Sequence, residues 1–261
     1  MIDVEGIVKD YGAVRAVDSV SFSVPRGTIF GLLGPNGAGK TTTIKMLTTA
    51  LRPTAGGISI DGRDPATEPE LVRRAFGIVF QDPSLDDDLT AFENMEFHGI
   101  LYGVPGLPRG ERIERLLRFV GLWERRDSFV RQFSGGMKRR LEIARALLHE
   151  PRILFLDEPT LGLDPQTRSH IWSYVRSRSR ERGLTVLFTT HYMDEADRNA
   201  DALAVIDRGK VVASGTPASL KEKTGKPSLE EAFIALTGHT LRDEEGTGVD
   251  QMRLGRRLWR G

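Results

Sequence analysis

The chain contains no cysteine among its 261 residues. This excludes disulfide bonds, thiolate-bound zinc and cysteine-held iron–sulfur clusters, so redox chemistry is not expected. Apolar runs such as residues 153–156 are far shorter than the roughly 20 residues that a membrane-spanning helix needs. The acidic start, residues 1–5, lacks the charged-then-apolar order of a secretory signal. We therefore expect a protein that stays in the cytosol.

Basic and acidic side chains are also nearly equal in number. The 37 basic and 36 acidic side chains give a formal net charge of +1 and a pI near 8.0. Sequence-independent binding to nucleic acid then lacks its usual electrostatic source, and no nucleic-acid partner is expected. At this length and 39% hydrophobic content, the chain can bury one large core, as a single domain or as a domain with an inserted subdomain.

A glycine-rich loop at residues 34–41 follows the pattern Gly-x-x-x-x-Gly-Lys-Ser/Thr. The apolar residues 28–33 before it predict a buried strand, and a helix is expected to begin at Lys40. Glycines let backbone N–H groups approach phosphate oxygens, Lys40 can reach the β- and γ-phosphates, and the Thr41 hydroxyl can ligate Mg²⁺. An ordinary glycine-rich turn is the alternative, which the strand and helix disfavour. The predicted nucleotide-binding residues here are Gly34, Pro35, Asn36, Gly37, Ala38, Gly39, Lys40, Thr41 and Thr42.

Two acids, Asp157 and Glu158, follow the apolar residues 153–156. Ligands bind at the carboxyl ends of strands in open α/β sheets, so Asp157 is expected to orient Mg²⁺ through water. Glu158 points elsewhere and can polarise the attacking water as a general base. On this segment alone, two solvated acids at the end of a core strand remain the alternative.

Hydrophobic periodicity and turn residues divide the chain into three regions. Short strands are predicted at residues 2–9, 17–24, 28–33, 57–60 and 76–80. A helical region from about residue 82 to 150 has predicted helices at residues 90–101, 110–120 and 135–149. Strands and helices then alternate up to residue 206, which predicts parallel strands joined by crossovers. The last predicted features are a hairpin turn at residues 207–210, helices near 217–224 and 229–236, and disorder from residue 239.

A Ser-Gly-Gly-Met segment at residues 134–137 lies between the glycine-rich loop and the acidic strand. Alone, Ser134 would be a plain helix N-cap. Because the three motifs occur in this order, residues 2 to about 238 resemble the nucleotide-binding subunit of an ABC transporter. The family usually has Leu before the serine and Gln after the glycines, so Phe133 and Met137 put an amide contact from the last position in doubt.

The resemblance implies a fold and a domain organisation. The fold would be α/β, a P-loop NTPase (ABC ATPase) core with an N-terminal antiparallel β subdomain and an inserted α-helical subdomain at about residues 82–150. The ABC ATPase domain would cover residues 1–238, and residues 239–261 would form a disordered tail.

The resemblance also implies roles for individual residues. In the family, the segment matching Ser134, Gly135 and Gly136 contacts the γ-phosphate of ATP held by the other subunit. Tyr11 matches the aromatic that stacks on adenine, although an edge-strand aromatic or looser nucleotide recognition remain alternatives. The other matches are Gln81, which touches Mg²⁺ and the water, His191, which hydrogen-bonds the γ-phosphate, and Asp164, in the loop that crosses the subunit interface. Outside the family context, Gln81 would be a loop polar residue, His191 a structural histidine and Asp164 a helix N-cap.

The expected cofactors are ATP and Mg²⁺, and the expected partners are a second copy of this chain and integral membrane permease subunits. The permease would dock beside residues 81–88 and hold the chain on the inner face of the membrane. Residues 89–94 and 229–238 look most like the daunorubicin-resistance ATPases, which export drugs or lipids. The short stretch after Leu236 favours export over import. The alternatives are soluble ABC ATPases of iron–sulfur assembly, ribosomes or DNA repair, and the second cassette, coiled coil or zinc module typical of the last two is missing here.

Overall fold

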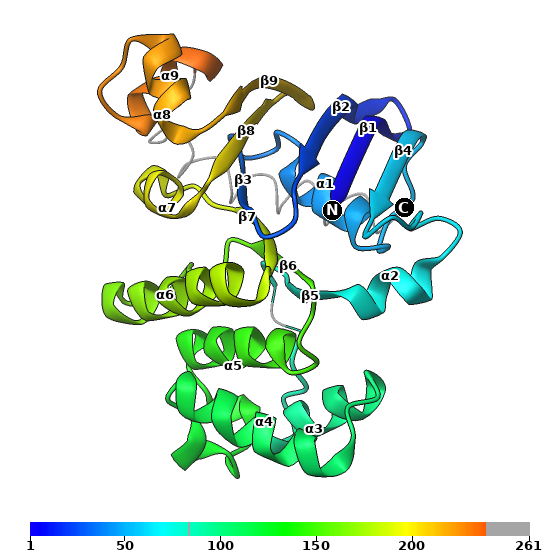
Figure 1. The fold of residues 1–261 in the computed structure, drawn as a ribbon, viewed down its shortest axis with the longest axis vertical. Helices are drawn as coiled ribbons and strands as arrows, with labels where there is room; N and C mark the ends of the chain where they lie inside the picture. The colour runs from blue at the N-terminus through cyan, green and yellow to red at the C-terminus, as the bar shows by residue number, and fades with distance from the viewer. Residues whose placement is uncertain (83, 239–261) are drawn as a thin grey trace, which may run out of the picture.

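The structure is a computed structural model that describes residues 1–82 and 84–238, whose strands form two sheets (Figure 1). In the smaller, antiparallel sheet, β1 lies between β2 and β4, and Ile2 pairs with Val24 on one side and Ile60 on the other. Ile2, Val4 and Ile7 of β1 are buried, because one face of this sheet covers a core. The strands are β1 (Ile2–Tyr11), β2 (Val14–Val24) and β4 (Ala55–Ile60).

The larger sheet has the strand order β5-β6-β7-β3-β8-β9, and all pairs except β8-β9 are parallel. Every residue of β3, β6 and β7 is buried, as expected of parallel strands covered on both faces. The carboxyl ends of these strands meet at one edge, so the glycine-rich loop after β3 lies near Asp157, the last residue of β6. The strands are β3 (Ile29–Leu33), β5 (Phe76–Val79), β6 (Ile153–Asp157), β7 (Thr185–Thr189), β8 (Ala202–Asp207) and β9 (Lys210–Gly215).

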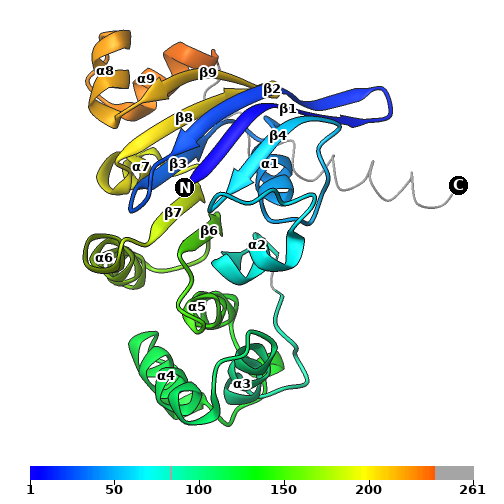
Figure 2. The same cartoon turned by 45° about the vertical axis from the view of Figure 1, so that its right-hand side comes forward.

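The helices form two sets. The helices between β5 and β6 are called the helical group below, and the others lie around the two sheets. Figures 1 and 2 show α3 and α4 at the end of the molecule farthest from α8 and β9. Between β5 and β6 the described residues form α3 (Ala91–Leu101), α4 (Gly106–Phe119), α5 (Gly135–Leu147) and two short 3-10 turns, Trp123–Arg125 and Val130–Gln132. The other helices are α1 (Lys40–Leu47), α2 (Pro69–Ala75), α6 (Pro165–Arg182), α7 (Met193–Asn199), α8 (Pro217–Thr224) and α9 (Leu229–Thr237).

Helix α4 begins at Gly106, earlier than the predicted start at residue 110. The structure places Pro108 in the first turn of this helix. The N–H groups of a first turn have no partner within the helix, so a residue without one is tolerated there. Elsewhere the helix predicted to begin at Lys40 and the hairpin predicted at residues 207–210 are confirmed.

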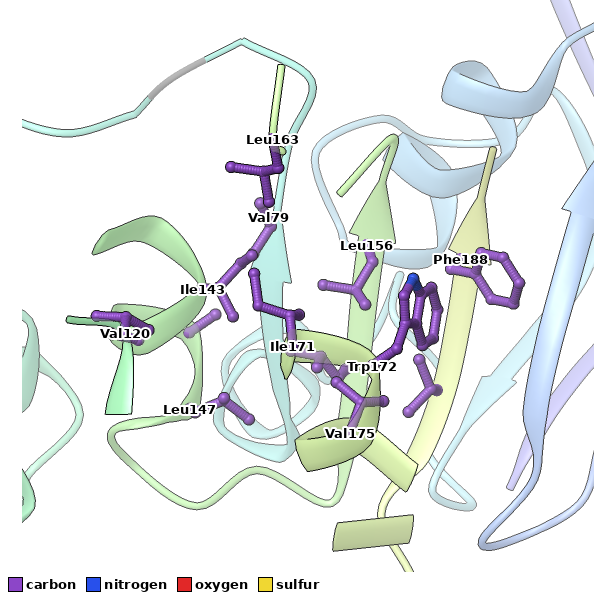
Figure 3. Packing of buried hydrophobic residues seen from close by; sticks show 14 of the residues in the cluster. Val79, Val120, Ile143, Leu147, Leu156, Leu163, Ile171, Trp172, Val175 and Phe188 are labelled. Atoms are coloured by element: carbon purple, nitrogen blue, oxygen red, sulfur yellow. The ribbon is translucent and has the colours of Figure 1, made fainter. Parts of the chain in front are cut away.

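A continuous apolar core joins the helical group to the larger sheet (Figure 3). Ile143 and Leu147 of α5 lie in this core with Ile171 of α6, Leu156 of β6 and Val79 of β5, and each is at most 7% exposed. A shift of α5 is therefore felt at the strands that carry the acidic residues, because packed interiors leave few voids to absorb it.

A second core lies between the two sheets and includes the α1 residues Ile44 and Leu47. Among the described helices, none combines the length and the apolar character needed to span a bilayer. The tail predicted at residues 239–261 lies outside the described residues.

Candidate functional site

The glycine-rich loop connects β3 to α1 and packs tightly against neighbouring backbone. A Cβ on Gly34 would lie 2.2 Å from the carbonyl oxygen of Ile206, and Gly39 has a φ of 106° with the Ala16 carbonyl 2.6 Å from where its Cβ would be. Both positions therefore need glycine for packing and backbone conformation. This requirement adds to the access for phosphate oxygens that the sequence predicted.

Lys40 is folded back onto this loop. Its Nζ donates hydrogen bonds to the carbonyl oxygens of Gly34, at 2.6 Å, and Pro35, at 3.0 Å, and the residue is only 8% exposed. The loop carbonyls thus compensate the ammonium for much of its lost hydration. A cation is held where the loop meets the first turn of α1, whose N-terminal N–H groups favour anions.

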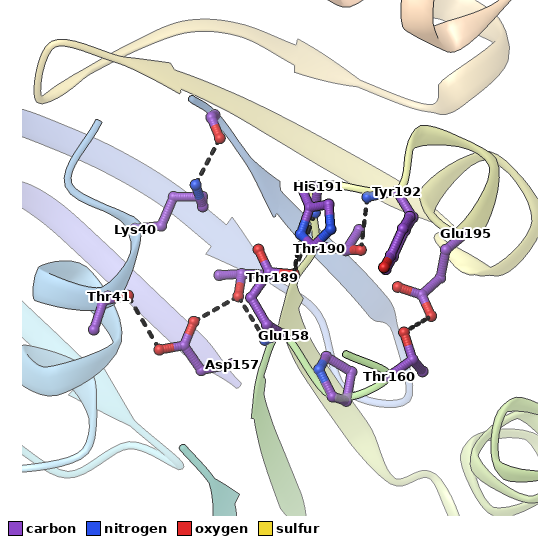
Figure 4. A network of polar contacts seen from close by, with 12 residues as sticks. Lys40, Thr41, Asp157, Glu158, Thr160, Thr189, Thr190, His191, Tyr192 and Glu195 are labelled. Atoms are coloured by element: carbon purple, nitrogen blue, oxygen red, sulfur yellow. Dashed lines mark hydrogen bonds and ion pairs between the residues drawn. The ribbon is translucent and has the colours of Figure 1, made fainter. Parts of the chain in front are cut away.

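Asp157 is buried at the end of β6 and receives two hydroxyl hydrogen bonds (Figure 4). Thr41 Oγ1 donates to its Oδ2 at 3.1 Å, and Thr189 Oγ1 donates to its Oδ1 at 2.6 Å. Burial raises the pKa of Asp157 above its ordinary value, because the charged carboxylate has lost water, while the two hydroxyl groups lower it by less. Asp157 thereby links α1, β6 and β7.

Glu158 turns its side chain away from Asp157 and toward His191. The carboxylate oxygen Oε2 lies 2.8 Å from His191 Nδ1 and accepts the His191 backbone N–H at 3.3 Å. This hydrogen bond raises the pKa of His191 above its ordinary value. The sequence assigned the two residues separate roles and did not predict their contact. Thr41, Asp157, Glu158, Thr189 and His191 are called the acidic network below.

The backbone of Glu158 has a φ of 52°, in the left-handed region that non-glycine residues seldom occupy. Its N–H donates to Thr189 Oγ1 at 3.0 Å. Such a conformation costs on the order of 1 kcal/mol and persists where surrounding contacts fix it. The turn after β6 is thus held in one conformation that aims the two carboxylates in different directions.

The oxygen donors around Asp157 fit Mg²⁺. This ion prefers hydroxyl and carboxylate oxygen, keeps several waters and takes further ligands from phosphates, so Thr41 and Asp157 can suffice on the protein side. Burial raises the pKa of the Asp157 carboxyl, and a divalent cation bound there would favour its charged form. The described residues contain no group of three or more His, Cys, Asp and Glu side chains suited to a metal.

Four predicted residues make no hydrogen bond to the acidic network within the described residues. Tyr11 is at the end of the β1–β2 hairpin and is 49% exposed, and Gln81 is exposed just after β5. Ser134 N-caps α5 through the Met137 N–H at 3.3 Å, and Asp164 N-caps α6 through the Thr167 N–H at 2.9 Å. No hydrogen bond within residues 1–82 and 84–238 connects Tyr11, Gln81, Ser134 or Asp164 to the acidic network.

Arg139 of α5 connects the helical group to the acidic strand, and the sequence interpretation missed it. Its guanidinium donates to the carbonyl oxygens of Asp157 and Glu158, each at 2.5 Å, to that of Pro159 at 3.1 Å, and to that of Phe80. The side chain is buried, and burial lowers the pKa of Arg139. One signal could have revealed it, since Arg139 occupies the apolar face of α5, at helical spacing from the buried residues 143, 146 and 147.

Glu195 of α7 was also missed. It is 4% exposed, and its Oε1 accepts hydrogen bonds from Thr160 Oγ1 and Trp172 Nε1, each at 2.6 Å. Its residue type gave no signal of this role, because acids are common in the first turn of a helix. Glu195 therefore fixes the start of the loop at residues 160–164 against the helix that follows His191.

Sequence comparison places this chain among well-defined relatives. A profile described as ABC transporter matches residues 17–161, more than half of the chain. The daunorubicin/doxorubicin resistance ATP-binding protein DrrA of Streptomyces peucetius is 47% identical over 87% of this chain and 69% of its own length. The linearmycin resistance ATP-binding protein LnrL of Bacillus subtilis is 42% identical over 90% of this chain and 75% of its own length.

Solved structures agree with this placement. An ATP-binding subunit of an ABC transporter superposes with a TM-score of 0.86 at 34% identity, covering 90% of this chain and 99% of its own. A dimeric ATP-binding cassette in a post-hydrolysis state, bound to ADP and Pi, superposes with a TM-score of 0.77 at 28% identity, covering 83% and 98%. The predicted α/β P-loop fold is therefore confirmed. The chain belongs to the ABC transporter family, as one of its ATP-binding proteins.

Proposed function

We propose that this chain hydrolyses ATP to drive export of a drug, lipid or other hydrophobic compound through a separate membrane permease. The observation that carries the proposal is the acidic network beside the glycine-rich loop: the Glu158 carboxylate lies 2.8 Å from His191, and Thr41 joins the loop helix to Asp157. A base held by a histidine, next to a phosphate-binding loop and a metal-orienting acid, suits phosphoryl transfer to water.

In this mechanism the loop N–H groups and Lys40 bind the β- and γ-phosphates of ATP. Thr41, Asp157 and Gln81 would hold Mg²⁺, which neutralises charge on the phosphates when bound. Glu158 accepts the proton of the attacking water at its carboxylate. His191 orients Glu158 through Nδ1 and donates a hydrogen bond to the γ-phosphate. Tyr11 stacks on the adenine ring.

We further propose that ATP is enclosed between two copies of the chain. Ser134 and Gly135 are exposed at the N-terminus of α5, and a Cβ on Gly136 would lie 3.3 Å from the Gly162 carbonyl in the loop that leads to Asp164. The first-turn N–H groups of α5 are thus exposed next to the loop at residues 160–164, where a phosphate held by a second copy could reach them. The dimeric solved relatives support this arrangement.

The permease would dock on the helical group, near residues 81–88. Phe97, Ile100 and Leu101 of α3 and Leu107 of α4 are 55% to 81% exposed, an apolar cluster that an isolated soluble surface seldom carries. Arg139 links this region to Asp157, so a movement of α5 would reach the acidic network. Export, rather than import, is supported by relatives named for drug resistance and for Nod factor export.

Inside-out membrane vesicles that contain the chain together with a permease encoded beside its gene test this function. ATP-dependent uptake of an anthracycline is expected with the wild-type chain and not with Glu158→Gln. ATP hydrolysis by a chain that never binds such vesicles, with no uptake, would point instead to a soluble ABC ATPase of iron–sulfur assembly, ribosomes or DNA.

Arg139→Gln is expected to lower ATP turnover at least about tenfold, because losing charged hydrogen bonds at buried carbonyls costs roughly 1.5–3 kcal/mol. Arg140→Gln on the same helix is the matched control, since Arg140 donates to the Val120 carbonyl, away from the acidic network. Turnover and thermal unfolding should be measured together. Equal losses of turnover in both variants would remove Arg139 from its positioning role.

A further inference from the structure

A basic pocket of about 210 Å³ lies at the opposite edge of the larger sheet, where β6 and β7 begin. Four segments surround it: the turn before β3, α4, the connection from α5 to β6, and the end of α6. Its floor is formed by the buried residues Leu116, Leu147 and Leu184. The arginines that line it, called the arginine pocket below, are Arg26, Arg115, Arg152, Arg178 and Arg182.

One acid, Glu150, lies among the pocket-lining residues. Its carboxylate is shared by Arg115, at 3.5 Å, by Arg182, at 3.4 Å, and by Arg112 nearby, at 3.3 Å. Arg152 pairs with Asp61 at 2.8 Å. Arg26 and Arg178 have no carboxylate within 4.0 Å in the described part of the chain. The pocket therefore carries an excess of positive charge over a small volume.

Helix ends explain only part of this charge. Basic residues are favourable in the last turn of a helix, which accounts for Arg182 on α6. Two carbonyls in the last turns of α6, those of Arg178 and Ser179, are already capped by the N–H of Gly183. Arg26 and Arg115 come from other segments, so convergence on one pocket, rather than helix capping, accounts for the charge.

The guanidinium groups of the pocket favour one kind of anion. A guanidinium presents a planar fork that matches phosphate oxygens in two-point contacts, and several forks around one cavity suit a group with more than one negative charge. The Tyr174 ring already stacks on Phe119, with 4.2 Å between the ring centroids. The guanidinium carbon of Arg178 lies 4.8 Å from the centroid of the Tyr174 ring. It is therefore not free to stack on a nucleobase.

We propose that the arginine pocket binds the phosphate group of a second ligand that carries no base, either a small polyphosphate or a phosphomonoester lipid headgroup. A phosphate there would contact α4 of the helical group and, through Arg26 and Arg178, the sheet side of the molecule. It would thus tie the two parts together at a point far from the acidic network.

Inorganic pyrophosphate is the probe, titrated calorimetrically into a chain carrying Lys40→Ala so that the glycine-rich loop contributes little. Pyrophosphate should bind this parent, and adding Arg26→Gln and Arg178→Gln should weaken its Kd at least about tenfold, since both arginines lose charged contacts. Arg198→Gln is the control, because Arg198 is an exposed arginine of α7 whose ion-pair partner among the described residues is Asp194, and it should leave the Kd unchanged. No binding by the parent, or equal Kd values with and without the two pocket substitutions, would overturn the proposal.

Vesicles distinguish the two sources of phosphate. If the chain sediments with phosphatidylcholine vesicles that contain phosphatidic acid, but not with phosphatidylcholine alone, the ligand of the pocket is a lipid headgroup. Arg26→Gln and Arg178→Gln should then abolish this sedimentation. Pyrophosphate binding without vesicle binding would assign it to a soluble polyphosphate. Neither result depends on ATP turnover, so the pocket and the proposed function fail or hold separately.

Discussion

Glu158→Gln is expected to lower ATP turnover at least about a hundredfold while ATP still binds, because general bases typically contribute 10²–10⁴ to a rate. The amide keeps the size of the side chain and its contact with His191 but cannot accept the proton of the water. The nucleotide-bound dimer should then persist. Phosphate release and light scattering in the presence of ATP and Mg²⁺ measure the two effects.

Glu114→Gln provides a matched control for this substitution. Glu114 lies on α4 and pairs with Arg118 in an exposed contact, and within the described residues it makes no hydrogen bond to the acidic network. It should leave turnover and dimer lifetime unchanged. Turnover by Glu158→Gln within about twofold of the wild type would show that the base is elsewhere.

Lys40→Ala is expected to weaken ATP binding roughly a hundredfold or more, since removing one partner of a buried charge contact costs about 3 kcal/mol. Lys40 is also held by Gly34 and Pro35, so its loss frees two loop carbonyls as well as removing a phosphate contact. Equilibrium binding of ATP, measured by calorimetry, reports the effect.

Lys45→Ala on the same helix separates this effect from a general change in α1. Lys45 is exposed, and its substitution should leave the Kd for ATP unchanged. Thermal unfolding of both variants shows whether the helix itself is perturbed. Tight ATP binding by a folded Lys40→Ala chain would remove Lys40 from the proposed site.

The sequence predicted those parts of the fold and site that depend on neighbouring residues. Short, mainly apolar runs such as β6 and β7 indicate buried strands, and the glycines and lysine of the loop form one contiguous motif. Helix α4 was predicted to start at residue 110 but begins at Gly106, and the proline at position 108 lies in its first turn, where the missing N–H is tolerated.

Contacts between distant segments could not be predicted in this way. The hydrogen bonds of Arg139 join α5 to the turn after β6, and they depend on how the helical group packs on the sheet. The contact between Glu158 and His191 depends on the pairing of β6 with β7, and on a left-handed φ at Glu158 that its residue type does not suggest.

The central claim is that each ATP lies between the glycine-rich loop of one copy and the Ser-Gly-Gly segment of the other. Gly135→Asp tests the second element with little effect on packing, because no heavy atom of the described residues, apart from its chain neighbours and its own helix backbone, lies within 4 Å of a Cβ at this position. The added carboxylate would repel the γ-phosphate held by the partner. Lys40→Ala and Gly135→Asp chains should each be inactive alone.

Mixing these two variants and measuring ATP turnover is the direct test. In a mixed dimer, the intact loop of one chain meets the intact Ser-Gly-Gly segment of the other at one of two sites. Half of the dimers are mixed at equal concentrations, so turnover should return to about a quarter of the wild-type value. A mixture as inactive as its two components would contradict the shared site.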